Sequence, residues 1–243
     1  MSTLDRLEKT RQRYARLKPG WAPATAVYQQ RVAAALSKGN CVLDLGCGRG
    51  GIVERLADSG AWLGVDPDIQ SLQQHRSATL ARGCAQSESL PFAAQTFDMI
   101  VASWVLEHLD HPRATFGEIG RLLRPGGSFF FLTPNARHPL SRLNAIIARM
   151  QPLHQQFIST LYERSPADTF PVTYRANTIR SIEYMAIGAG LQLVEIALID
   201  DPAYLALGPW ALLPAVALEM ILPALCKVHL VGHFVKRPPA WGA

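Results

Sequence analysis

The chain has 243 residues, 49% of them apolar and 18% charged, which fits one globular α/β domain with insertions. Its net charge of +5 permits contact with an acidic membrane or nucleic acid but requires neither. The four cysteines form no CxxC pair, which argues against zinc, and we expect buried, reduced thiols of a cytosolic protein, Cys41 and Cys84 lying in strand-like surroundings. The first eighteen residues are charged throughout, unlike a secretory signal.

The first half of the chain predicts strands that alternate with helices. Two helices are expected within residues 1–40, the second from about Pro23 to Ser37. Short apolar runs predict buried parallel strands. The expected elements are strands at 41–45 and 61–66, a weak strand centred on Cys84, a strand at 97–103, and helices at 52–56 and about 68–80.

The second half continues this pattern and then departs from it. A helix should begin at Asp110-His111-Pro112, end before Arg124, and be followed by a strand at 128–133. Beyond a long insertion, Asn177 is the expected cap of a helix that ends near residue 188. Strands are expected at 191–199 and 228–238. This alternation predicts parallel βαβ units in one domain over 1–243, with N-terminal helices (1–40), a cofactor-binding core (41–135) and cap insertions (136–176 and 200–226).

A glycine-rich loop follows the first strand, with Gly46, Gly48 and Gly50. Glycine lets the backbone approach a ligand closely and adopt positive φ, and the free N–H groups of the next helix favour an anionic group. Asp66 ends the second strand twenty residues after Gly46, where a carboxylate can accept hydrogen bonds from ribose hydroxyls. Together these features predict an adenosine cofactor, whereas the glycines alone would also fit a tight turn.

Asp44 bears on which adenosine cofactor is bound. Residues 46–51 also match GxGxxG, the dinucleotide pattern, which is weak by itself. Asp44 stands two residues before the first glycine and should face the space beside the loop. A carboxylate there suits the cationic amino and sulfonium end of S-adenosylmethionine and would repel a pyrophosphate.

Five segments, in order, resemble the motifs of class I S-adenosylmethionine-dependent methyltransferases. The resemblance is to the methyltransferase type 11-like group typified by the quinone-biosynthesis methyltransferases, and it covers about residues 40–135. The segments are VLDLGCGRG (42–50), GVDPD (64–68), AQSESLPF (85–92), FDMIVASWVLEHL (97–109) and RLLRPGGSFFFLTPN (121–135). The resemblance implies a Rossmann-like, mostly parallel seven-stranded sheet whose last strand is antiparallel, with helices on both faces and a helical cap from the insertions.

The same resemblance implies how the cofactor is held. Gly46 and Gly48 approach the methionine part, Asp66 holds the ribose, and Pro67 packs near the adenine. Gln86 stands where the family usually has an acidic residue, although its amide oxygen can still accept from the adenine amino group. The expected cofactor-binding residues are Asp44, Gly46, Cys47, Gly48, Asp66 and Pro67, with Gln86 and Ser87 at the adenine edge and Ser103 near the methionine amino group.

The reaction makes modest demands on the protein. An activated sulfonium mainly needs to be aligned with its acceptor, and a carbon or oxygen acceptor also needs a base. His108 and His138 follow the fourth and fifth strands, at the edge of the sheet where ligands bind. Both are candidate bases; the alternative for each is a residue that packs or caps a helix. Glu107 is either a solvated helix residue or points at the cofactor loop. No metal site is expected.

The insertions should shape the acceptor site. Apolar residues at helical spacing from Leu143 to Leu161 suggest a cap over the site. Residues 203–226 carry a single charge, Glu219, but three prolines and the return of the last strand to the sheet argue against a membrane span. This segment is either a cap on the domain or on a second subunit, as in a homodimer, or a peripheral membrane contact that admits a lipid-like acceptor.

The basic N-terminal helix has three interpretations: a solvated face, a contact with an anionic membrane, or RNA binding, which the absence of a nucleic-acid module argues against. We therefore expect a cytoplasmic enzyme, or one peripheral at the inner membrane face, that methylates a small-molecule or lipid-like acceptor. The alternatives are a nicotinamide-dependent Rossmann oxidoreductase and a non-catalytic cofactor-binding scaffold.

Overall fold

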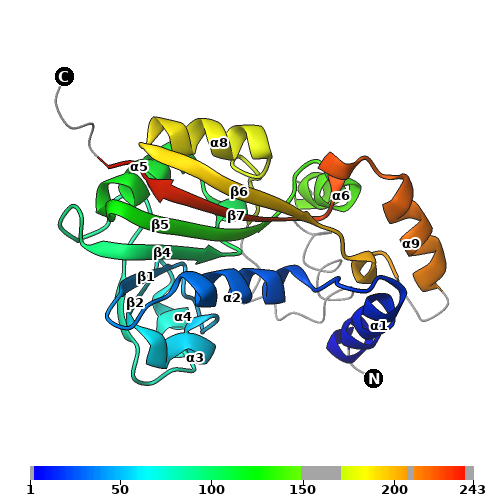
Figure 1. Cartoon of the computed structure of the whole chain (residues 1–243), viewed down its shortest axis with the longest axis horizontal. Helices are drawn as coiled ribbons and strands as arrows, with labels where there is room; N and C mark the ends of the chain where they lie inside the picture. The colour runs from blue at the N-terminus through cyan, green and yellow to red at the C-terminus, as the bar shows by residue number, and fades with distance from the viewer. Residues whose placement is uncertain (1–2, 149–170, 207–210, 239–243) are drawn as a thin grey trace.

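A computed structural model describes residues 3–148, 171–206 and 211–238. Its centre is a seven-stranded sheet in the order β3-β2-β1-β4-β5-β7-β6 (Figure 1). The strands are β1 (Cys41–Leu45), β2 (Ala61–Asp66), β3 (Ala81–Cys84), β4 (Phe97–Ser103), β5 (Leu123–Pro134), β6 (Leu191–Ile199) and β7 (His229–Lys236). Only β7 among them runs antiparallel to its neighbours. The predicted Rossmann-like α/β fold is confirmed.

Helices cover both faces of the sheet. Those assigned are α1 (Thr3–Leu17), α2 (Ala24–Ala35), α3 (Val53–Leu56), α4 (Ile69–Gln73), α5 (Pro112–Leu122), α6 (Pro139–Ala148), α8 (Ile179–Gly188) and α9 (Leu212–Ile221). Short 3-10 helices include η2 (Leu106–His108), η4 (Pro202–Tyr204) and η6 (Ala224–Cys226). In Figure 1, α1, α6 and α9 lie together at one end of the sheet, whereas α5 and α8 lie over the body of its strands.

The alternation of side chains along the strands creates two separate cores. On one face, Leu43 and Phe129 pack in a cluster that includes Phe116 of α5 and Ile182 of α8. On the other face, the adjacent residues of the same strands pack against Tyr28 and Val32 of α2. Because successive side chains of a strand point to opposite faces, a strand that is buried on both sides is apolar along its length. This explains the uninterrupted apolar runs in the sequence.

Three predicted boundaries are corrected. The helix expected at 68–80 ends at Gln73, because the chain beyond it bonds to the glycine loop: the Arg76 N–H donates to the Arg49 carbonyl at 2.9 Å. The strand centred on Cys84 instead ends there. β5 begins at Leu123 and is therefore longer than the expected strand.

Two predicted helix caps are each wrong by one residue. Thr178, not Asn177, caps α8, through a reciprocal pair of bonds with Ser181. The amide of Asn177 is used elsewhere, donating to the Thr133 hydroxyl at 2.6 Å. At α5, His111 rather than Asp110 occupies the capping position, although its side chain makes no capping bond.

The cysteine prediction is confirmed only in part. Cys41, Cys47, Cys84 and Cys226 are free thiols. Cys47 is buried and Cys41 is half-buried, but Cys84 is exposed. The reason is that β3 is the edge strand of the sheet and all four of its residues are exposed.

The insertions form helices at the carboxyl end of the parallel strands. The first gives α6, and the rest of its expected apolar helical face, from Met150 to Leu161, lies outside the described residues. In the second, η4, α9 and η6 are separate helical pieces. Among the described residues, no helix is both long enough and apolar enough to cross a bilayer.

Candidate functional site

The glycine loop is tied tightly to the end of β2. The N–H groups of Gly46 and Cys47 both donate to the carbonyl of Val65, at 2.8 and 3.0 Å. Gly46 has a φ of 72° and Gly48 a φ of 48°, in the left-handed region that glycine tolerates. A Cβ at Gly46 would also collide with the side chain of Val105. The loop therefore needs glycine at Gly46 both for its backbone conformation and for its close approach to the segment after β4.

Asp66 lies at the carboxyl end of β2 and faces this loop. Its Oδ2 atom accepts from the Gly48 N–H at 2.9 Å, and its Oδ1 atom accepts from the Asp68 N–H at 2.8 Å. Burial raises the pKa of Asp66, and these two backbone bonds oppose that shift. Each carboxylate oxygen can accept more than one hydrogen bond, so the side chain is oriented and still able to accept from a diol.

Asp44 is buried in β1, the strand that leads into the loop. Burial, followed by the charge of Asp66, raises its pKa to about 7. Two carboxylates that disfavour each other's ionisation form a site that a cation would stabilise. This arrangement fits S-adenosylmethionine, which carries a sulfonium and an ammonium group, and it opposes the pyrophosphate of a dinucleotide.

Cys47 contributes backbone rather than side chain to the loop. Its thiol is buried against β2, because a Cβ on Gly64 would come within 2.7 Å of the Cys47 sulfur. Burial, with the charges of Asp44 and Asp66, raises the pKa of this thiol to about 12. The thiol is therefore a neutral packing group, and a cofactor contact at Cys47 remains a prediction for its main chain.

The residues expected around the adenine gather beside Asp66. The Ala85 N–H donates to the Asp66 carbonyl at 3.3 Å, which joins the segment after β3 to the end of β2. Pro67 and Gln86 are exposed there. The Ser87 hydroxyl lies 2.9 Å from that of Thr115 in α5 and is thereby tied to that helix. The fold thus brings these residues to one edge of the sheet, and their roles remain predictions.

Ser103 lies at the same edge. It is the last residue of β4, half-buried, and pairs with Leu132 of β5. It therefore lies at the carboxyl end of a central strand, next to β1, and its place beside the methionine amino group remains a prediction.

His108 ends η2, near the cofactor loop. Its Nδ1 atom lies 2.8 Å from the carbonyl of Pro171, and a carbonyl can only accept, so Nδ1 carries the proton. The neutral ring then has its lone pair on Nε2, which lies 4.0 Å from Oε1 of Glu107.

His138 is placed very differently. Its side chain is 1% exposed, and its Nε2 atom lies 3.2 Å from Oε1 of Glu219 in α9. Its Nδ1 atom accepts from the Leu140 N–H at 3.2 Å, at the start of α6. Both ring nitrogens are therefore engaged in holding two helices together, and this geometry favours the structural alternative over a base.

A buried polar chain at the same edge was not identified from the sequence. Glu107 is buried, and its Oε2 atom accepts from the Thr133 hydroxyl at 3.0 Å. That hydroxyl in turn accepts from the Asn177 amide at 2.6 Å. These three residues are far apart in the sequence. Glu107 and Asn177 were each considered singly from the sequence, but their connection through Thr133 was not predicted. The burial of Glu107 contradicts the alternative that it is a solvated helix residue. The pairing of β4 with β5 and the return of the chain before α8 bring them together.

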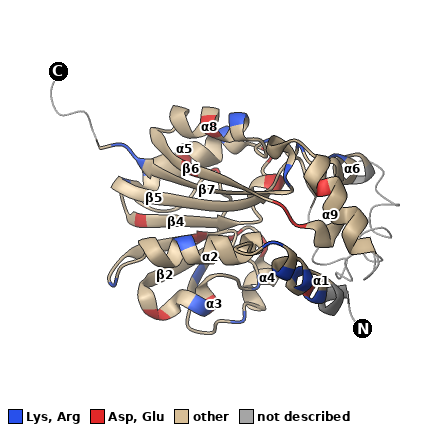
Figure 2. Cartoon of the chain, turned by 45° about the vertical axis from the view of Figure 1, so that its right-hand side comes forward, with Lys and Arg blue, Asp and Glu red and all other residues tan. Residues whose placement is uncertain are grey.

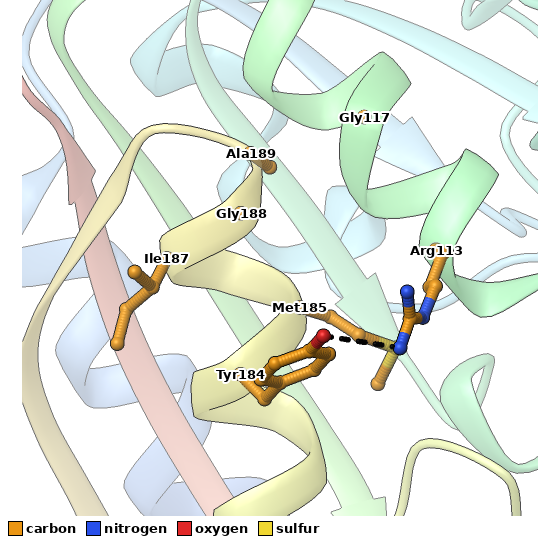
Figure 3. A pocket seen from close by; sticks show the side chains of 7 residues that line it. All are labelled: Arg113, Gly117, Tyr184, Met185, Ile187, Gly188 and Ala189. Carbon is orange, nitrogen blue, oxygen red and sulfur yellow. Dashed lines mark hydrogen bonds between the residues drawn. The ribbon is translucent and has the colours of Figure 1, made fainter.

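A separate pocket of about 370 Å³ lies between α5 and α8 (Figure 3). Arg113 and Tyr184 point toward each other across it, with a hydrogen bond of 3.2 Å and the guanidinium 4.9 Å from the ring centroid. The lining residues are Arg113, Gly117, Tyr184, Met185, Ile187, Gly188 and Ala189. None of them belongs to the predicted site, so this pocket is distinct from the glycine loop.

The family model and the curated relatives that match this chain are all described as methyltransferases. Residues 12–196 match the family model described as a methyltransferase domain. The chain is 31% identical over 155 residues to a malonyl-[acyl-carrier protein] O-methyltransferase of Herminiimonas arsenicoxydans, which covers 57% of this chain and 59% of that protein. It is 36% identical over 137 residues to a ubiquinone biosynthesis O-methyltransferase of Idiomarina loihiensis, covering 49% and 56%. The chain thus spans less than two thirds of these curated relatives.

Solved structures show the same fold at low identity. An S-adenosylmethionine-dependent methyltransferase from Mesorhizobium loti matches with a TM-score of 0.59 and 16% identity, covering 88% of this chain and 99% of that one. The [4+2]-cyclase SpnF matches with a TM-score of 0.57 and 16% identity, covering 88% and 79%. A similar fold thus carries different chemistries.

The family match covers well over half of the chain, and it includes the glycine loop, Asp44 and Asp66. The acidic site beside the loop fits the positive charge of the expected cofactor, S-adenosylmethionine. The chain belongs to the methyltransferase domain family.

Proposed function

We propose that this protein transfers the methyl group of S-adenosylmethionine to a small-molecule or lipid-like acceptor. The observation that carries the proposal is the buried pair Asp44 and Asp66 at the glycine loop, where burial and the charge of Asp66 raise the pKa of Asp44. A site of this charge favours a sulfonium cofactor over a nicotinamide dinucleotide. When bound, the cofactor supplies an activated methyl group, and the protein's residues orient it toward the acceptor.

Calorimetry with the whole chain tests the cofactor, using S-adenosylhomocysteine and NADH as the two ligands. We expect binding of the first in the micromolar range and none of the second. Binding of NADH without S-adenosylhomocysteine would instead support the oxidoreductase alternative.

We propose His108 as the base for acceptors that must lose a proton. The carbonyl of Pro171 fixes the tautomer with its lone pair on Nε2, and the side chain lies on the loop after β4, at the ligand-binding edge of the sheet. His138 is the second candidate, and its two ring contacts make it the weaker one.

Turnover needs its own test, because a similar fold serves a cyclase and because a scaffold could bind the cofactor without reacting. Cell extract is incubated with the protein and methyl-labelled S-adenosylmethionine, and mass spectrometry identifies species that gain one methyl group. The enzyme proposal requires a product that depends on both the protein and the cofactor. Cofactor binding without any such product would favour the scaffold.

We further propose that the protein is a cytoplasmic enzyme and that its second insertion, residues 203–226, makes a peripheral contact with a membrane. The support is an apolar surface on α9, whose exposed residues include Leu213 and Met220. A homodimer through the same segment is the alternative, and vesicle binding measured alongside oligomeric state separates the two.

A further inference from the structure

The α9 helix presents apolar side chains to the outside and its one charged side chain to the inside. Glu219 is 1% exposed, whereas Met220 and Ile221 are each 79% exposed and Leu213 is 69% exposed. A helix on the surface of a globular protein normally shows the opposite distribution. Large exposed apolar side chains on consecutive turns mark a surface that contacts another apolar phase.

Buried contacts fix this orientation of α9. Oε1 of Glu219 lies 3.2 Å from Nε2 of His138, and its Oε2 lies 3.5 Å from Nζ of Lys227. Lys227 also donates to the backbone carbonyl of Glu219. Turning the apolar face inward would separate Glu219 from His138 and Lys227 and so break these contacts. The apolar face therefore stays outside.

The neighbouring helix α1 supplies positive charge. Lys9, Arg13 and Arg16 are exposed and lie at a spacing of four and then three residues, which places them on one face of the helix. Figure 2 shows Lys and Arg gathered on α1, beside α9, which is uncharged apart from one acidic residue. The two helices are neighbours in both Figure 1 and Figure 2, and both contact η4.

Ion pairs hold α1 in this place. Arg11 reaches Asp201 at 2.7 Å, and the Asp201 carboxylate is 1% exposed. Lys18 reaches Asp200 at 2.6 Å, and the hydroxyl of Tyr14 donates to the same carboxylate at 2.9 Å. The basic helix is therefore anchored to the segment that leads into α9, and the two helices form one unit.

We propose that the exposed faces of α1 and α9, the docking surface, bind the surface of an anionic lipid bilayer. Leu213, Met220 and Ile221 would enter the boundary between headgroups and acyl chains, while Arg13 and Arg16 contact the anionic headgroups. This inference deepens the proposed membrane contact by adding a second helix and a lipid class. It rests on the proposed function only in one respect, namely that a lipid-like acceptor would reach the protein from the bilayer.

The charge of α1 favours a bilayer over a second copy of the chain. A symmetric dimer through the whole docking surface would bring two basic helices to one interface, where like charges repel each other. An anionic bilayer offers the opposite charge and the apolar phase together.

The test is flotation of the full chain with vesicles of phosphatidylcholine alone or with a third of phosphatidylglycerol, at low and high salt. We expect binding to the mixed vesicles that is at least tenfold stronger than to phosphatidylcholine and that weakens with salt. Met220→Glu with Ile221→Glu should reduce binding to mixed vesicles at least tenfold. Arg13→Glu with Arg16→Glu should remove the preference for the anionic lipid.

Matched controls lie on α8. Ile187→Glu changes an exposed apolar residue, and Arg180→Glu an exposed basic one, so both should bind vesicles like the wild type. Light scattering and S-adenosylhomocysteine binding are measured on every variant. The inference is overturned if the wild type does not bind vesicles. It is also overturned if the wild type forms a dimer that the Met220 and Ile221 substitutions dissociate. If the wild type binds mixed vesicles but does not bind S-adenosylhomocysteine, the proposed function is overturned and the membrane inference stands.

Discussion

The carboxylate of Asp66 accepts a hydrogen bond from the Gly48 N–H at 2.9 Å, joining the end of β2 to the middle of the glycine loop. Asp66→Ala should therefore lose both the order of the loop and the ribose contact, and bind S-adenosylhomocysteine about 10- to 100-fold more weakly, since each tenfold is about 1.4 kcal/mol. Calorimetry measures the change. Asp58→Ala, at an exposed position, is the control and should bind normally. Unchanged affinity in Asp66→Ala would refute the ribose assignment.

Asp44 should make folding stability depend on pH. Burial and the charge of Asp66 raise its pKa from 3.8 to about 7. Between these values the folded protein keeps a proton that the unfolded chain has released, so the free energy of unfolding falls as pH rises through this range. Asp44→Asn should be more stable than the wild type near pH 8, by on the order of 1 to 4 kcal/mol. Urea unfolding at about pH 5 and pH 8 tests this, and a difference that does not grow with pH contradicts it.

The same carboxyl should couple cofactor binding to protons. A cationic cofactor favours the ionised form of Asp44, so binding releases a proton below about pH 7, and affinity for S-adenosylmethionine should rise as pH increases toward 8. Calorimetry in two buffers with different ionisation enthalpies measures the released proton. In Asp44→Asn the release should disappear and the affinity should be weaker.

Gly46 and Gly51 offer a matched pair of substitutions in the loop. Gly46→Ala places a Cβ against the side chain of Val105 and forces a positive φ of 72° on alanine. Gly51→Ala meets nothing within 4 Å. The first should lower the free energy of unfolding by about 1 to 3 kcal/mol and weaken cofactor binding, whereas the second should do neither. Equal effects of the two would show that close packing at Gly46 is unimportant.

Substitution of His108 should affect catalysis, whereas substitution of His138 should affect stability. His108→Gln should reduce methyl incorporation into extract by about 100-fold or more while leaving S-adenosylhomocysteine affinity unchanged, as expected for a general base. His138→Gln removes a buried partner of Glu219 and should instead lower the free energy of unfolding by about 1 to 3 kcal/mol. The reverse pattern would move the base to His138.

The sequence predicted the strands of the sheet more accurately than the contacts within the site. β2 and β4 were predicted to the residue because buried parallel strands are apolar runs with clear limits. The bounds of β6, an edge strand, were also predicted to the residue. The helix after β2 was overestimated, since nothing in its sequence reveals that Arg76 bonds back to the glycine loop. Glycines and acids of the loop were identifiable because backbone conformation and charge restrict the residue types there.

Long-range pairings account for the rest. His138 follows a strand and carries a titratable ring, so its sequence position suggests a base equally well as a structural residue. Its role depends on Glu219, which is 81 positions away. The polar chain from Glu107 to Asn177 likewise exists only after the strands have paired. Such contacts between distant residues carry no periodic or local signal in a single sequence.

The position of β7 has a consequence for how the molecule assembles. This strand follows all others in the chain, yet it lies between β5 and β6 and pairs with both. Until it has been synthesised, β5 and β6 have no shared partner, and each exposes an edge to other nascent chains. Completion of the sheet is therefore a late, non-local step, which should make refolding slow and sensitive to protein concentration.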